Sequence, residues 1–296
     1  KTQGQIDNIN ELVEHLTNTK LSKSGRYSNK RVGSFARVNY RGVQSNGIDT
    51  SQTSRLKFYN AYFLNEISLI YNNDWQHLST NTTGDSITIE ASLEYPAGTF
   101  KRITFNGANS VVIPYGTQVE CDPIGVTIPN NTYYWIRTYT SVTAGQIWIN
   151  THASDSGYTE GVVLNTNSVV SGTIGNSTTN CFGPSIIFGS NNNKRYSFFC
   201  TGDSIAAGQG DSGYTSMGFS FGGGLFSRTL GPTSATIHTQ LPGGTVAGFI
   251  TNRGRRLLDL ASACDFHLSN YGTNDISGGA TFATVAQNLC NLWFLV

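Results

Sequence analysis

The stretch YSFFCTGDSIAAG, at residues 196–208, decides how the second half of the chain folds. Its first five residues form a short apolar run that predicts a strand, and the glycine-rich turn after it leads into helical sequence. A serine at the sharp turn between a strand and a helix projects its hydroxyl at the carboxyl edge of the sheet, near the positive end of the helix dipole. Ser204 is predicted to hold this position, which suits a nucleophile.

Two further strands are predicted downstream, at residues 235–238 and 265–270. Helical sequence is found at residues 219–230, 248–260 and 281–294. Strands that alternate with helices pair in parallel through crossover connections, so residues 194–296 are predicted to form an α/β layer domain.

The loops after these two strands read LPGGT at 241–245 and NYGTND at 270–275. Because the carboxyl ends of neighbouring parallel strands open into one crevice, both loops are predicted to meet the turn at Ser204. The backbone N–H groups of Ser204 and Gly243 and the side-chain amide of Asn274 then provide three donors around one point. Such a cluster stabilises the oxyanion of an acyl-transfer reaction, and losing one donor costs about 3–4 kcal/mol of transition-state stabilisation.

Together these motifs resemble the SGNH (GDSL-type) hydrolase superfamily, over about the last hundred residues. The matching blocks are Gly202-Asp203-Ser204, Gly243 (or Gly244), and Gly272-Thr273-Asn274-Asp275. The resemblance implies a flavodoxin-like three-layer domain that hydrolyses esters, with Ser204 as nucleophile and Gly243 and Asn274 as oxyanion donors. It also implies that the reaction needs no cofactor and no metal ion.

The chain departs from that pattern where the superfamily has a later Asp-x-x-His, because no His follows Asn274. A parallel sheet that ends after its third strand also exposes an apolar edge. Three explanations stay open: the recorded sequence is cut short, another chain or a permuted segment supplies the missing part, or the domain is a non-catalytic relic. Without a base, a serine hydroxyl is a weak nucleophile at neutral pH.

None of the five histidines replaces the missing base convincingly. The chain's own Asp-x-x-His is Asp74-Trp75-Gln76-His77, beside a predicted strand of the first half. Roughly one chance match to this pattern is expected in five chains of this length, so the motif is a weak candidate. His238 ends the second strand and is a candidate to line the crevice, although a structural role is favoured. His267 is predicted to point into a helix layer, and His15 and His152 are predicted to lie at the surface.

The first half of the chain has a different pattern. Residues 1–33 are predicted to form an amphipathic helix and a polar linker, and residues 34–193 form short β runs separated by turn residues. About eight to ten such runs indicate an all-β sandwich or jelly roll that binds glycans or anchors the protein. The runs are RLKFYNAYFL (55–64), EISLIY (66–71), DSITIEASLEY (85–95), FKRITF (100–105), SVVIPY (110–115), YYWIRTYT (133–140) and GQIWIN (145–150).

Aromatic side chains in this half offer faces on which sugar rings stack, although core packing is the favoured role for most of them. The candidates are Trp75, Trp135, Trp148, Tyr133 and Tyr134. The five cysteines have no CxxC spacing, so buried free thiols are expected.

Composition excludes several classes of protein. Among 296 residues only 12% are charged and the formal net charge is +1, so neither nucleic acid nor an anionic membrane is an expected partner. No apolar run approaches the roughly 18 residues of a membrane span. Charge-poor β sequence rich in Ser, Thr, Asn and Gly is common in exported proteins and virion fibres, so an extracellular or virion-surface location is expected.

The preferred hypothesis is an ester hydrolase, specifically a carbohydrate O-deacetylase acting on surface polysaccharide. The polysaccharide or another acylated compound is then the partner, and a homo-oligomer or virion assembly is a further expectation. The alternative is a non-enzymatic virion or cell-surface structural or adhesion protein that retains an SGNH-like domain. Activity that depends on Ser204 separates the two.

Overall fold

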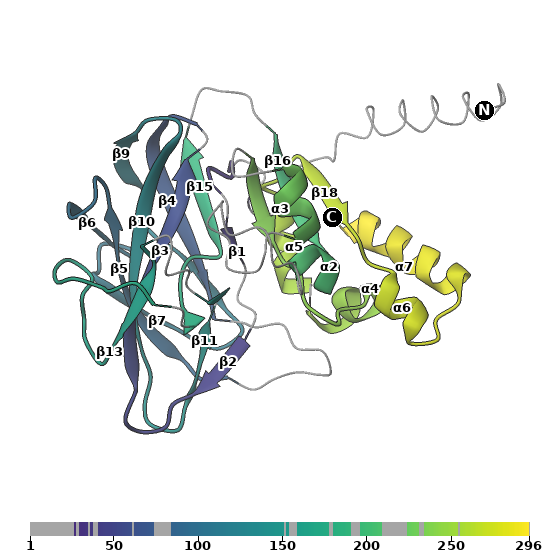
Figure 1. Cartoon of the computed structure of the whole chain (residues 1–296), viewed down its shortest axis with the longest axis horizontal. Coiled ribbons are helices and arrows are strands. Elements are labelled where there is room, and N and C mark those ends of the chain that lie inside the picture. The colour runs from purple at the N-terminus through teal and green to yellow at the C-terminus, as the bar shows by residue number, and fades with distance from the viewer. Residues whose placement is uncertain are drawn as a thin grey trace.

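The structure is a computed structural model in which a β-rich part and a helix-bearing part lie side by side (Figure 1). It describes residues 27, 30–34, 36–37, 41–60, 62–73, 84–150, 152–153, 159–177, 180–190, 196–208, 224–230, 234–253 and 255–295. The predicted N-terminal helix and the Asp74–His77 motif lie outside these residues. No helix among the described residues is long and apolar enough to cross a membrane.

Two antiparallel sheets make up most of the β-rich part. In the larger sheet the order is β13-β3-β10-β5-β6, with β7 also paired to β5. Its strands are β13 (Gly161–Leu164), β3 (Ser51–Asn60), β10 (Thr132–Ser141), β5 (Ile87–Glu94), β6 (Phe100–Ile103) and β7 (Ser110–Ile113). The smaller sheet contains β15 (Ile186–Ser190), β4 (Leu64–Asn72), β8 (Gln118–Glu120) and β9 (Ile124–Ile128).

The two sheets share one hydrophobic core. Alternate residues of each strand enter it, as Leu56 of β3, Leu69 of β4 and Ile89 of β5 do. The prediction of an antiparallel β-rich first half is therefore confirmed, whereas a jelly-roll topology stays a prediction. Two short antiparallel pairs complete this part: β2 (Arg41–Gln44) with β11 (Ile147–Asn150), and β12 (His152–Ala153) with β14 (Asn180–Cys181).

One predicted run is wrong in its extent, because residues 55–64 contain a strand end. Strand β3 stops at Asn60 and β4 begins at Leu64. The buried Asn60 side chain donates to the carbonyls of Ile128 and Pro129 and accepts from the N–H of Tyr62. Such an Asn side chain replaces ladder bonds with local ones and turns the chain.

The helix-bearing part contains the parallel sheet that the sequence predicts. Strand β16 (Ser197–Thr201) lies between β17 (Ala235–His238) and β18 (Phe266–Ser269), and both pairings are parallel. The helices are α2 (Ser204–Ala207), α3 (Gly224–Leu230), α4 (Val246–Gly248), the π-helical turn η3 (Phe249–Arg253), α5 (Arg255–Ala261), α6 (Thr273–Ser277) and α7 (Phe282–Leu295).

One helix differs from its prediction, because residues 248–260 form a succession of α4, η3 and α5 rather than one continuous helix. Gly248, at the end of α4, has a low helix propensity. The start lies earlier than predicted because the Thr245 side chain caps α4 by accepting from the N–H of Gly248.

A fourth strand extends the parallel sheet from an unexpected place. Strand β1 (Ala36–Arg37) pairs in parallel with β17, although these residues belong to the predicted β-rich segment. Tyr27 also links the two parts, since its N–H donates to Ser262 and its hydroxyl accepts from Gln118. Residues of both parts share a second core, which contains Ile70 and Ile237. The division at residues 33 and 193 stays a prediction.

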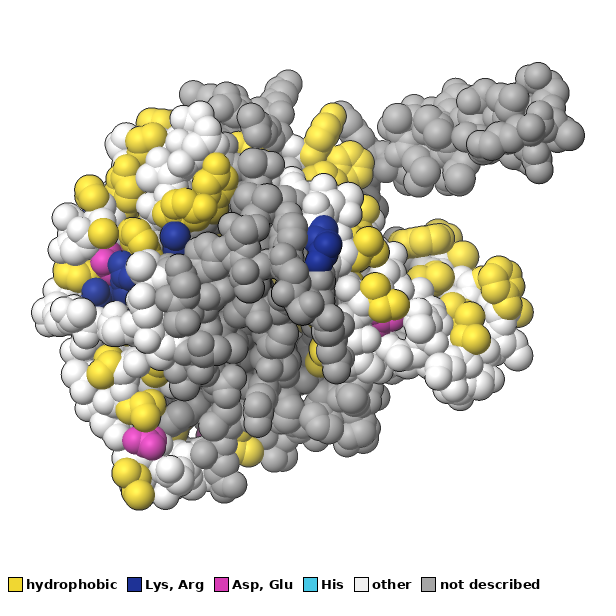
Figure 2. Space-filling view, in the orientation of Figure 1, with side chains coloured by type: hydrophobic (Ala, Val, Ile, Leu, Met, Phe, Trp, Pro, Cys, Tyr) yellow, Lys and Arg dark blue, Asp and Glu magenta, His cyan; other side chains and the backbone are white. Residues whose placement is uncertain are grey.

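The opposite edge of the sheet, at β18, has no paired strand among the described residues. Phe266 at the start of β18 is 43% exposed, in agreement with the apolar edge expected when a parallel sheet ends there. Exposed apolar side chains also lie on α7, as the yellow areas over this helix in Figure 2 show. They are Phe282, Trp293, Phe294 and Leu295.

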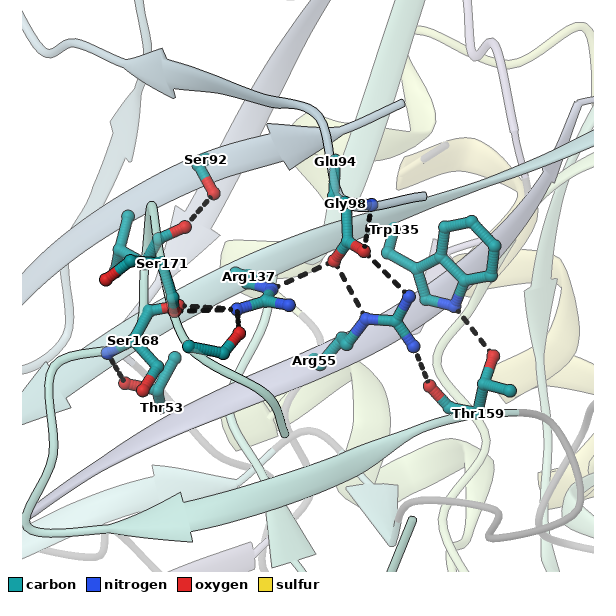
Figure 3. Close-up of polar contacts among 12 residues, drawn as sticks. Thr53, Arg55, Ser92, Glu94, Gly98, Trp135, Arg137, Thr159, Ser168 and Ser171 are labelled. Carbon is teal, nitrogen blue, oxygen red and sulfur yellow. Dashed lines mark hydrogen bonds and ion pairs between the residues drawn. The ribbon is translucent and has the colours of Figure 1, made fainter. Parts of the chain in front are cut away.

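A buried charged network lies on the face of the larger antiparallel sheet that points away from the core shared with the smaller sheet (Figure 3). The Glu94 carboxylate accepts from Nε of Arg55 at 2.8 Å, from Nη2 of Arg55 at 2.9 Å and from Nε of Arg137 at 2.9 Å. The N–H of Gly98 adds a fourth hydrogen bond at 2.9 Å. Burial on its own raises the pKa of the Glu94 carboxyl, but these hydrogen bonds outweigh it and lower the pKa to about 2.

The two guanidinium groups hold the chain on either side of β13 against the sheet. Nη1 of Arg137 donates to the carbonyls of Ser168, Ser171 and Gly172. Nη1 of Arg55 donates to the carbonyl of Thr159. The guanidinium of Arg55 also stacks on the Trp135 ring at 4.3 Å, and that of Arg137 stacks on Phe100 at 4.4 Å.

Candidate functional site

Ser204 is the first residue of α2, directly after the turn that ends β16. Asp203 caps the helix, because its Oδ1 atom accepts from the N–H of Ile205 at 2.9 Å. Ser204 is partly exposed, and neither its hydroxyl nor its N–H has a hydrogen-bond partner among the described residues. Within the described part of the chain, the hydroxyl and the N–H of Ser204 are therefore both free to bind a ligand.

Asn270, just after β18, holds the turn in front of Ser204. Its Oδ1 atom accepts from the Asp203 N–H at 3.1 Å, and its Nδ2 donates to Oδ1 of Asp203 at 2.8 Å. The side chain packs so closely on Gly202 that a Cβ there would lie 1.8 Å from Oδ1 of Asn270. A glycine is therefore needed at position 202 because the Asn270 side chain approaches so closely, and not because the backbone there has an unusual φ angle.

The loop after β17 is bonded directly to this turn. The N–H of Leu241 donates to the carbonyl of Gly202 at 2.9 Å. Residues 241–244 form a tight turn closed by the Gly244 N–H on the carbonyl of Leu241, with Pro242 second and Gly243, at φ +76°, third. Proline followed by glycine with positive φ is the pattern of a type II turn.

This turn distinguishes between Gly243 and Gly244, the two glycines that the sequence left as alternative N–H donors. The N–H of Gly244 is used within the turn, whereas that of Gly243 has no acceptor among the described residues. Gly243 is exposed and Gly244 is buried against Tyr271. Of the two, Gly243 has the N–H that a ligand can reach.

Asn274, the second residue of α6, ties the third loop to the second. Its Nδ2 donates to the carbonyl of Gly244 at 3.0 Å, which uses one of the two amide hydrogens. The neighbouring Asp275 is buried, and its carboxylate accepts from the N–H groups of Val246 at 3.1 Å and Ala247 at 3.5 Å. The structure therefore connects the three loops through hydrogen bonds, as their positions after the parallel strands predict.

The two described parallel-strand histidines are engaged elsewhere. His238 is buried, and its ring nitrogens contact Gln240 at 2.9 Å and Thr236 at 3.0 Å. Nε2 of His267 lies 2.9 Å from Oγ1 of Thr201, and burial lowers the pKa of this imidazole to about 4. The preference for structural roles at both positions agrees with these contacts. His15 and His77 lie outside the described residues, as does the side chain of His152.

The aromatic candidates divide between core and surface. Tyr134 is fully buried in the β-rich core, which excludes it as a sugar-stacking residue. Tyr133 is 41% exposed, with the ammonium of Lys57 at 3.8 Å from its ring centre. Trp135 is half-buried, and its Nε1 donates to Oγ1 of Thr159. Trp75 and the Trp148 side chain lie outside the described residues.

The five cysteines are all free thiols. Four of them are buried as expected, but Cys290 on α7 is exposed, so that expectation is wrong at this position. Among the described residues, no group of three His, Cys, Asp or Glu side chains has an arrangement able to hold a metal ion.

Compared with protein-family models, the sequence matches none, and no curated protein matches it. Among solved structures the chain has distant similarity to family two carbohydrate esterases. One, from Cellvibrio japonicus, is 11% identical, with 90% of this chain and 74% of that chain covered and a TM-score of 0.25. Another, from Clostridium thermocellum in complex with cellohexaose, is 14% identical over 85% of this chain and 72% of that one, with a TM-score of 0.26.

A Bacillus subtilis protein, YXIM_BACsu, is 11% identical over 86% of this chain and 52% of that one, with a TM-score of 0.29. TM-scores this low leave the function to be argued from the chain's own residues.

Sequence reasoning missed Asn270 as a member of the site. The available signal was its position at the end of the third parallel strand, where polar side chains of an α/β sheet face the shared crevice.

Proposed function

We propose that the chain is the acyl-transfer part of an ester hydrolase in which Ser204 is the nucleophile. The observation that carries the proposal is the hydrogen-bonded junction of the three loops. Leu241 joins the second loop to the first, and Asn274 joins the third to the second. On this junction the N–H groups of Ser204 and Gly243 have no acceptor among the described residues.

In the proposed reaction, Oγ of Ser204 attacks the acyl carbon, and its proton passes to a general base. The N–H groups of Ser204 and Gly243 and the free amide hydrogen of Asn274 bind the oxyanion that forms. The tetrahedral intermediate then expels the substrate's alkoxide oxygen, which receives the proton from the base. A water molecule attacks the acyl-serine in the same manner, releasing the acid and restoring Ser204.

The general base belongs to the proposal as a group outside the described residues. His238 and His267 are not suited to this role. Both ring nitrogens of His238 are bonded to neighbouring side chains, and burial lowers the pKa of His267 to about 4, which makes its imidazole a weak base. Asp203 is also unsuited, since its Oδ1 atom is committed to the turn and its side chain is buried.

The proposed substrate is a neutral O-acylated carbohydrate, an O-acetylated surface polysaccharide being the preferred case, and the proposed location is extracellular. The three loops, residues 202–208, 241–245 and 270–275, contain no Lys or Arg. A phosphorylated or carboxylated substrate requires a cation near its charge, whereas an ester of a sugar hydroxyl requires only hydrogen-bond donors and a polar surface.

The experiment compares the full chain with Ser204→Ala on p-nitrophenyl acetate and on an acetylated xylo-oligosaccharide. Ser234→Ala is the matched control, because the Ser234 hydroxyl donates to the carbonyl of Leu230 in the same domain and lies away from the three loops. Each protein is assayed with and without added imidazole, which acts as an external base. The rate measured with Ser204→Ala is subtracted as background.

Hydrolysis by the wild type and by Ser234→Ala, lost in Ser204→Ala, supports the proposal. A rate that needs imidazole in the wild type and stays at background in Ser204→Ala supports the nucleophile and shows that the chain as prepared lacks the base. Equal rates for wild type and Ser204→Ala under both conditions contradict it. The alternative, a non-enzymatic surface or virion component, is favoured by the engagement of both described histidines and gains support from that last result.

A further inference from the structure

Among the described residues, Asn270 is the one side chain that forms hydrogen bonds with both the backbone and the carboxylate of Asp203, the residue before Ser204. Its amide oxygen accepts from the Asp203 N–H and its amide nitrogen donates to Oδ1 of Asp203. We infer that Asn270 is a positioning residue for the nucleophile, acting through Asp203. This inference deepens the proposed function and depends on it for its kinetic consequence.

The two hydrogen bonds fix the turn from both sides. Oδ1 of Asp203 receives Nδ2 of Asn270 and the N–H of Ile205, so one oxygen connects β18 to the first turn of α2. The other carboxylate oxygen, Oδ2, is buried and has no hydrogen-bond partner among the described residues. Without Asn270, the buried Asp203 carboxylate keeps one hydrogen bond within the described part of the chain, from the N–H of Ile205. The free energy needed to rotate this side chain out of the turn therefore falls.

Contact with the backbone makes this restraint specific to Asn270. The amide oxygen fills the space above Gly202, where even one added carbon would lie at 1.8 Å. The carbonyl of Gly202 also accepts the Leu241 N–H, so a shift of this peptide moves the loop that carries Gly243. One amide group thereby restrains both the turn before Ser204 and, through the Gly202 peptide, the loop that carries Gly243.

Displacements of this kind act on the reaction more than on substrate binding. Catalytic groups have to be held within about 0.5 Å of the productive geometry, and a shift of about 1 Å reduces the rate by about 10²-fold. Removing Asn270 is therefore expected to lower kcat by about 30- to 100-fold and to change KM by less than about threefold.

The experiment uses three variants of the full chain. Asn270→Ala removes both hydrogen bonds. Asn270→Asp keeps the shape of the side chain. Two ionised carboxylates repel each other there, whereas one proton shared between them at lower pH restores the missing donor. Asn167→Asp is the matched control, because the Asn167 amide also donates to a carboxylate, Oε1 of Glu90, at an exposed position of the β-rich part.

Two readouts separate this inference from the proposed function. The first is hydrogen exchange of the Asp203 and Ile205 amides, measured on a peptide that covers residues 197–208, and it needs no activity. The second is kcat and KM on p-nitrophenyl acetate, expressed relative to the wild type at pH 5 and at pH 8. If the wild type requires imidazole, the concentration of its neutral form is kept equal at both pH values, because only that form accepts a proton.

Faster exchange in Asn270→Ala, with a fall in kcat and a near-constant KM, supports the inference. So does an Asn270→Asp variant that is poor at pH 8 and recovers relative to the wild type at pH 5, while Asn167→Asp follows the wild type. Unchanged exchange in Asn270→Ala overturns it, as does faster exchange with an unchanged kcat. A wild type that hydrolyses nothing refutes the proposed function, and the exchange result still decides whether Asn270 holds the turn.

Discussion

Replacement of Glu94 by Gln tests the charged network in the β-rich part. Among the described residues, Glu94 is the acidic member of this network. Its side chain is 3% exposed and accepts from both Arg55 and Arg137. The Glu94→Gln variant leaves two buried guanidinium groups without a counter-charge, and breaking a buried ion pair in this way costs about 3–5 kcal/mol.

The pKa of Glu94 gives the same magnitude by a separate route. The ordinary value is 4.5 and the folded value is about 2. At about 1.36 kcal/mol per pH unit, that difference corresponds to about 3 kcal/mol of folding stability at neutral pH. Because the folded pKa is the lower one, this stability is fully present above about pH 4.5 and is lost as the pH falls through about 2.

The assay is urea unfolding of the wild type and Glu94→Gln, followed by near-ultraviolet circular dichroism at pH 7, 4.5 and 2.5. We expect Glu94→Gln to be less stable by about 3 kcal/mol at pH 7, and the difference to shrink as the pH falls below 4.5. Glu90→Gln is the control on the same strand. Its pair with Arg102, at 2.7 Å, is partly exposed, so a loss of about 0–1 kcal/mol is expected. A difference below 1 kcal/mol at pH 7, or one that does not depend on pH, would refute the reasoning.

Three further predictions concern the helix-bearing part. Asn274→Ala removes a donor and the bond to the carbonyl of Gly244, so kcat on the acetyl reporter should fall by about 10²–10³-fold; a fall of less than tenfold would remove it from the oxyanion site. Gly202→Ala places a carbon against Asn270, so thermal unfolding should show a loss of about 2–3 kcal/mol; an unchanged melting temperature would contradict this close contact. Cys290 should be the one thiol of the native protein that reacts with a disulfide reagent, because the other four are buried; rapid reaction of two or more would disprove that burial.

The parallel strands could be predicted because each is a short apolar run followed by turn residues. Phe199 and Ile237 enter the core, and the glycines after their strands mark where each chain segment leaves the sheet. The convergence of the loops then follows from parallel pairing alone. The prediction needed no knowledge of side-chain contacts. It therefore placed Ser204 and Asn274 in neighbouring loops but did not indicate the hydrogen bonds of Asn270.

The charged network and the fourth parallel strand were beyond the same reasoning. Arg55, Glu94 and Arg137 alternate with apolar residues on their strands, a pattern typical of a face in contact with water. Their burial comes from the chain on either side of β13, where the carbonyls of Thr159 and of residues in the range 168–172 accept from the two arginines. The local sequence pattern does not indicate such long-range contacts. Residues 36–37 likewise have no apolar period, and their strand exists because β17 offers an unpaired edge.

The bonds that hold the candidate site together run between the loops themselves. They join Leu241 to Gly202, Asn274 to Gly244 and Asn270 to Asp203, and none of them involves a proton acceptor for the serine. In the proposed hydrolase, assembly of the oxyanion donors and supply of the general base are therefore separate properties. In serine hydrolases that lack a member of the triad, the oxyanion site and substrate binding alone retain roughly 10³–10⁴-fold catalysis over water. If the donors here are preassembled to the same degree, an external base should accept the proton of a serine that is already in place. Asn270→Ala and Asn274→Ala should then each lower the rate by the same factor with imidazole as without it.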